Sequence, residues 1–89
     1  MAAGIEKSTF SPLYDVLRAR LVAMRQKAGL TQRELAERLG REHSFVGRIE
    51  LGERRLDVVE FYWLCWACGR DAAKTASELM KALQKADRR

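Results

Sequence analysis

The 89-residue sequence contains little proline, histidine or cysteine, and it has no long apolar run. Pro12 is its only proline, His43 its only histidine, and Cys65 and Cys68 its only cysteines. No stretch approaches the roughly 18 apolar residues that span a membrane. The first residues also lack the basic start and apolar core of a secretory signal. We therefore expect a cytoplasmic protein with no membrane partner.

The same scarcity limits the chemistry that the chain can perform. A structural zinc site needs four ligands, and the sequence offers a single Cys-x-x-C at Cys65 and Cys68. Both cysteines fall on the predicted core face of a helix, so we expect them to be small buried hydrophobic residues. No nucleophile–base pair and no glycine-rich phosphate loop accompany His43. The sequence thus predicts no catalytic residues, no metal site, no cofactor and no enzyme.

Runs in which apolar and polar residues alternate over a strand length are also absent, so an all-α fold is expected. The chain is 47% hydrophobic and long enough for one small domain. We predict a compact bundle of about five helices. Residues 1–11 are expected to form a flexible N-terminal arm, residues 12–69 the main domain, and residues 70–89 a C-terminal helix for packing or dimerisation.

Local start and stop signals place the helices. Ser11 precedes Pro12 at a first helical position, while Thr31-x-x-Glu34 and Asp57-x-x-Glu60 form capping boxes. Glycine, which adopts the left-handed conformation of a helix end, follows four of the expected helices, at Gly29, Gly40, Gly52 and Gly69. The predicted helices span residues 12–28, 32–39, 43–51, 58–68 and 72–87. In the last of these, an apolar stripe is formed by Ala73, Ala76, Leu79, Met80 and Leu83.

Positive charge is the chain's strongest compositional feature. Seventeen lysines and arginines oppose 12 acidic residues, and the net charge is +5. Twelve of the cations are arginines, whose planar fork suits phosphate and guanine. This balance favours a polyanion such as nucleic acid as the partner, although a solvated basic surface would have the same composition.

The most specific pattern is an ordered set of residues between Arg25 and Arg54. It consists of Arg25-x-x-x-Gly29-Leu30-Thr31-Gln32-x-x-Leu35-Ala36-x-x-Leu39-Gly40, followed by Ser44-x-Val46-x-Arg48-Ile49-Glu50-x-Gly52-x-Arg54. Two short helices joined by a glycine turn have the form of a helix-turn-helix. The whole pattern resembles the lambda-repressor-like helix-turn-helix family, also called the Cro-type or xenobiotic-response-element (XRE) regulators.

The resemblance implies that residues 12–69 are a DNA-binding domain and that helix His43–Leu51 lies in the major groove of double-stranded DNA. The positions that read bases would be His43, Ser44, Gly47 and Arg48. The positions that contact phosphate would be Gln32, Arg41, Arg54 and Arg55. The resemblance also implies a structural ion pair between Arg25 and Glu50.

Three positions depart from the family pattern. Arg41 stands where an apolar turn residue is usual, and Glu42 stands where Ser, Thr or Pro commonly starts the recognition helix. Gly47 lies inside that helix, where glycine costs about 0.5–1 kcal/mol relative to alanine. Gly47 could admit close approach to a base, or it could mean weak contact there.

The helix over residues 58–68 carries two tryptophans beside its core face, Trp63 and Trp66. They could be covered by the last helix or by the N-terminal arm, or they could form an interface. We expect a homodimer interface, because exposed apolar patches commonly mark such surfaces. The sequence therefore predicts a dimeric, sequence-specific DNA-binding transcriptional regulator, acting as a repressor. The alternative is a protein-interaction module on the same fold, such as an antitoxin or adaptor with a protein partner.

Overall fold

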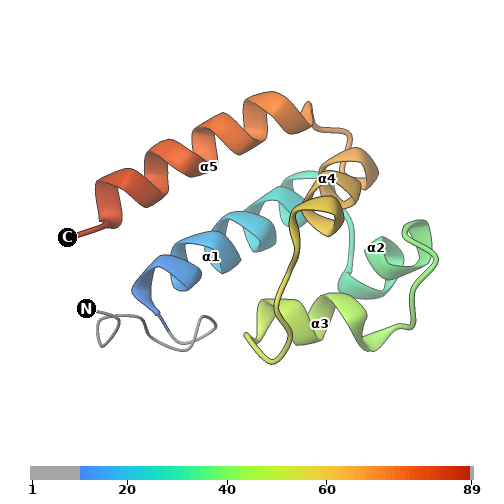
Figure 1. The fold of residues 1–89 in the computed structure, drawn as a ribbon. Helices are drawn as coiled ribbons and strands as arrows, with labels where there is room; N and C mark the ends of the chain where they lie inside the picture. The colour runs from blue at the N-terminus through green and yellow to red at the C-terminus, as the bar shows by residue number, and fades with distance from the viewer. Residues whose placement is uncertain (1–10, 89) are drawn as a thin grey trace.

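Five helices follow one another in residues 11–88, the part of the chain that the computed structural model describes (Figure 1). They are α1 (Pro12–Lys27), α2 (Gln32–Arg38), α3 (Ser44–Glu50), α4 (Val58–Ala67) and α5 (Ala72–Ala86). This range contains no strand, so the all-α prediction is confirmed. Each helix boundary lies within one residue of its predicted position. The predicted N-terminal arm lies outside the described residues except for Ser11.

The helix starts agree with their capping signals. The Thr31 hydroxyl accepts a hydrogen bond from the Glu34 N–H at 3.0 Å, and the Glu34 carboxylate accepts one from the Thr31 N–H at 2.9 Å. Asp57 and Glu60 form the same reciprocal pair at the start of α4. By contrast, α3 has no side-chain cap, and His43 occupies its N-cap position in helical geometry. The start of α3 is held instead by a backbone hydrogen bond, which the Phe45 N–H donates to the Glu42 carbonyl at 3.0 Å, and by burial of the Phe45 side chain.

The core lies where α1, α2, α3 and α4 meet. The buried cluster comprises Leu21, Met24, Leu35, Ala36, Phe45, Val46, Ile49, Leu64, Cys65, Ala67 and Cys68. Both cysteines are free and buried, as expected of small core residues. Burial raises the pKa of the Cys65 and Cys68 thiols, which keeps them protonated and unreactive.

Helix α5 runs back along α1, on the side of α1 away from α3 (Figure 1). Only Leu79 of its apolar stripe is buried, whereas Ala76 and Leu83 are half-buried and Ala73 and Met80 are exposed. The reason is that α5 packs against the other helices on one side only, so that a narrow part of the stripe is covered. The outer face of α5 therefore lies on the surface of the bundle.

A buried ion pair fixes α3 relative to α1. Arg25 on α1 donates to the Glu50 carboxylate through Nε at 2.7 Å and Nη2 at 3.1 Å, and through Nη1 to the Leu30 carbonyl at 3.0 Å. Gln32, the first residue of α2, donates to Glu50 Oε1 at 2.7 Å. The side chains of Arg25 and Glu50 are only 12% and 8% exposed. The hydrogen bond with Glu50 raises the pKa of Arg25, so the guanidinium stays charged.

We expect Arg25→Ala to lower the free energy of unfolding by about 3 kcal/mol, because it leaves the Glu50 charge buried without its main partner. Urea unfolding followed by circular dichroism would measure the loss. Arg33→Ala is the matched control, since Arg33 lies 4.0 Å from Glu37 in a well-exposed pair and should contribute less than about 1 kcal/mol. Equal losses in the two variants would contradict a structural role for the buried pair.

Candidate nucleic-acid interface

Helix α3 has an apolar face in the core and a polar face toward solvent. The buried residues are Phe45, Val46 and Ile49. Three of the four residues predicted to read bases, His43, Ser44 and Arg48, are exposed. Because the buried face and the Glu50 pair hold the helix, its polar face is presented in a defined orientation.

Arg48 presents an exposed guanidinium group on this face. Within residues 11–88, its guanidinium forms no ion pair and no hydrogen bond with another side chain. His43, by contrast, has its Nε2 3.6 Å from Glu37 Oε2, and both side chains are more than half exposed. Arg48 therefore keeps all five of its donors for a ligand, which is what bidentate recognition of guanine requires.

Gly47 differs from the other candidates because it is half-buried and lies against α2. A Cβ atom at this position would come within 3.2 Å of Gln32 Oε1. The missing side chain thus gives Gln32 the space in which it reaches Glu50. This packing is a structural reason for a glycine inside α3. Base reading by Gly47 and phosphate contact by Gln32 stay predictions.

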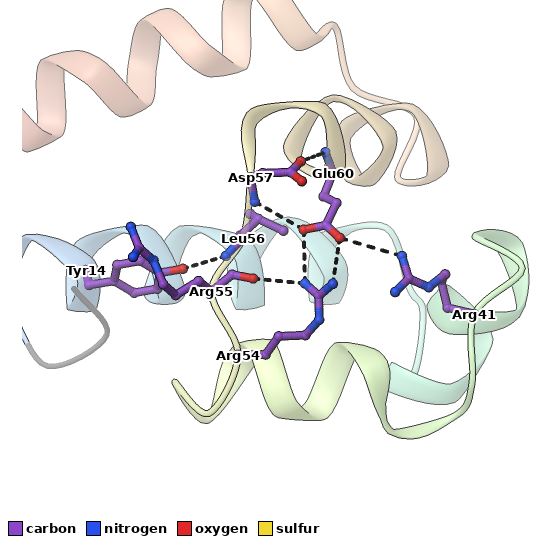
Figure 2. Close-up of polar contacts among 7 residues, drawn as sticks. All are labelled: Tyr14, Arg41, Arg54, Arg55, Leu56, Asp57 and Glu60. Atoms are coloured by element: carbon purple, nitrogen blue, oxygen red, sulfur yellow. Dashed lines mark hydrogen bonds and ion pairs between the residues drawn. The ribbon is translucent and has the colours of Figure 1, made fainter. Parts of the chain in front are cut away.

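Two of the arginines predicted to contact phosphate converge on a buried carboxylate (Figure 2). Arg54 donates to Glu60 at 3.0 and 2.8 Å, in a fork-to-fork geometry. Arg41 lies 3.6 Å from Glu60 Oε2. Both guanidinium groups also lie over the Phe45 ring, 4.0 Å (Arg41) and 4.8 Å (Arg54) from its centre. This cluster, formed by Arg41, Phe45, Arg54 and Glu60, joins the turn before α3 to the start of α4.

The same cluster anchors the α3–α4 loop. Arg54 also donates to the Arg55 carbonyl at 2.9 Å, and the Tyr14 hydroxyl accepts from the Leu56 N–H at 2.8 Å (Figure 2). The exposed Arg55 side chain has no ion-pair partner within the described residues. Of the four residues predicted to contact phosphate, Arg55 is therefore the one whose charge is left for an external anion.

The sequence alone assigns Glu60 only to the capping box of α4. Its carboxylate in fact serves both the cap and the two arginines, and it is almost buried. A glutamate at the third helical position gives no sign of this second role. The arginine-rich loop that faces it, at Arg54 and Arg55, was the only available signal.

No helix in residues 11–88 has the length and apolar character needed to cross a membrane. Within the same range, no three His, Cys, Asp or Glu side chains are grouped closely enough to hold a metal ion.

We expect Glu60→Gln to reduce the loss of stability at acid pH. Hydrogen bonds from Arg54 hold the pKa of Glu60 below its ordinary value of 4.5. The unfolded chain therefore takes up this proton at a higher pH than the folded chain does. The stabilisation is complete above pH about 4.5 and is lost as the pH falls further. Glutamine retains the capping-box hydrogen bonds but does not titrate.

Urea unfolding at several pH values between 3 and 7 would measure this effect. The variant should be less stable than the natural chain at neutral pH, and the two should approach one another at low pH. Glu37→Gln, at an exposed position, should retain the natural pH dependence. Parallel pH curves for Glu60→Gln and the natural chain would rule out the role given to this carboxylate.

Comparison with known proteins agrees with this geometry. Residues 16–77 match the family described as "Helix-turn-helix domain". No curated protein matches the chain at a significant level. A solved structure, described as an XRE-family like protein from Pseudomonas syringae pv. tomato str. DC3000, is 46% identical. The match covers 79% of this chain and 85% of that one, with a TM-score of 0.74. The chain therefore belongs to the XRE-type helix-turn-helix family of DNA-binding regulators.

Proposed function

We propose that this DNA-binding regulator is a sequence-specific, homodimeric repressor that inserts α3 into the major groove. The observation that carries the proposal is the free guanidinium of Arg48, on the exposed face of a helix whose other face is fixed in the core. Arg48 would pair with guanine, and His43 and Ser44 would contact neighbouring base edges or phosphate. Gly47 would contact a base beside them, as predicted. The Gln32 side chain packs in the space next to it.

Phosphate contacts would come mainly from Arg55, because its side chain is exposed and unpaired. Arg41 and Arg54 would act differently. Their charges are partly neutralised by Glu60, and their side chains are only 32% and 28% exposed. We infer that these two arginines position the loop, and that any contact they make with phosphate is secondary.

The dimer would form through the outer face of α4. Trp63 and Trp66 are 48% and 64% exposed, and Val59 and Tyr62 lie next to them at helical spacing. A continuous apolar surface of this kind is a common mark of a protein interface. Two copies paired there could place their α3 helices about one DNA turn apart, roughly 34 Å. The same face would equally serve the alternative function, a module that docks a protein partner as an antitoxin or adaptor does.

We expect Arg48→Ala to lower discrimination at one base pair by about 1–3 kcal/mol, because a bidentate contact with guanine is lost. Arg55→Ala should instead weaken binding to all sequences alike and reduce the slope of log K against log salt by about one. Sites selected from random DNA, followed by gel-shift titrations at several salt concentrations, would measure both effects.

Arg33→Ala is a suitable control for these titrations, because Arg33 is an exposed arginine outside the proposed contacts. Arg33→Ala should change base discrimination less than Arg48→Ala does. It should also change the slope of log K against log salt less than Arg55→Ala does. If Arg48→Ala and Arg55→Ala weakened every site equally, Arg48 would not be a base reader. An unchanged affinity in both variants would contradict the proposed orientation of α3.

We expect Trp63→Ser combined with Trp66→Ser to convert a dimer into a monomer, because the apolar face of α4 is removed. Analytical ultracentrifugation at micromolar concentrations would measure the change. Leu51→Ser, at a site that is 69% exposed outside α4, should leave the dimer intact. A natural chain that is monomeric at high micromolar concentration would exclude the homodimer and favour the partner-docking alternative.

A further inference from the structure

A second basic surface lies between α1 and α5, away from α3. This groove, which we call the α1–α5 groove, is lined by Arg20, Lys27, Arg70, Lys81, Lys85 and Glu78, with small alanines between them. Only Arg70 is paired, with its Nη2 3.8 Å from Glu78 Oε1. Among the residues that the structure describes, the other four cations have no ion-pair partner. The groove therefore carries a large uncompensated positive charge.

An apolar pocket opens beside one end of this groove. Met24, Ala28 and Cys68 line it together with Lys27 and Arg70, and its volume is ≈ 210 Å³. Because Lys27 and Arg70 also line the groove, the two hollows lie next to one another. A cavity of about 150 Å³ is enough to hold a benzene ring. The pocket can therefore accept one leucine or phenylalanine side chain.

We propose that the α1–α5 groove binds an acidic segment of another protein, with an apolar side chain of that segment in the adjoining pocket. The unpaired cations of the groove favour a ligand with several negative charges. The apolar pocket favours a peptide over a nucleic acid, since a sugar-phosphate backbone has no aliphatic side chain to bury. This inference goes beyond DNA binding and does not depend on it.

The position of the groove has a functional consequence. Helix α1 separates it from α3, since α1 contacts α3 on one side and α5 on the other (Figure 1). The proposed protein segment and DNA could therefore occupy the molecule together. Binding should also relieve repulsion between Lys81 and Lys85, which lie four residues apart on one helix face.

A synthetic peptide tests the proposal on the full chain. The probe is a fluorescent ten-residue peptide of aspartates and glutamates with one leucine, and its control has alanine in place of leucine. We expect the leucine peptide to bind roughly tenfold more tightly, because only it fills the pocket. Amide signals of α1 and of the C-terminal half of α5, measured by NMR, should shift on titration.

Substitutions separate the two parts of the site. Lys81→Glu combined with Lys85→Glu should weaken both peptides at least tenfold. The double change Arg33→Glu with Lys74→Glu removes the same charge from exposed positions outside the groove and should have little effect. Ala28→Trp should fill the pocket and abolish the preference for leucine while leaving the affinity of the alanine peptide largely unchanged. The NMR spectrum of each variant verifies its fold.

Three results would overturn the proposal. The first is that neither peptide binds at millimolar concentration. The second is that the peptides shift the signals of α3 in place of those of α1 and α5, which would mean that they occupy the DNA-binding face. The third is that a short DNA duplex displaces the leucine peptide from the groove, which would make the groove a second nucleic-acid site.

Discussion

The buried carboxylate of Glu50 is the constraint on which the arrangement of this domain depends. A charge so nearly excluded from water needs a partner, and Arg25 supplies it with a forked pair of hydrogen bonds. Gln32 adds a third donor, and Arg18 donates to the Glu50 carbonyl at 3.1 Å. These contacts come from α1 and from the start of α2. The position of α3, and with it the direction of Arg48, is thereby tied to two other helices.

The carboxylate of Glu60, near the N-terminal end of α3, is also buried and also paired with arginine. Its charge draws in Arg41 and Arg54, which also cover the ring of Phe45. The net charge of +5 is therefore a poor guide to the DNA-binding surface. Some cations form ion pairs inside the molecule, whereas others, such as Arg48 and Arg55, have no ion-pair partner within the described residues. Only the free cations can release counterions from DNA and add to its salt-dependent affinity.

Much of the fold could be predicted because its signals are local. A capping box such as Thr31 with Glu34 spans only three residues, so the sequence alone places the helix start. The partners of Glu60 could not be found in this way, since Arg41 lies 19 positions away, in the turn after α2, and only the packing of α2 on α4 brings it close. The contact between Gly47 and Gln32 is equally non-local. The sequence therefore predicted the helices that carry the candidate residues better than it predicted which of those residues have internal partners.

The two basic surfaces should act nearly independently of one another. A helix with its side chains is about 10 Å across, and α1 stands between the α1–α5 groove and α3. At physiological salt the Debye length is about 8 Å, so a charge bound in the groove is largely screened at the DNA-binding face. An acidic segment in the groove would thus add a partner without competing for DNA. Coupling between the two sites would have to pass through the position of α1 itself, which the Arg25–Glu50 pair holds in place.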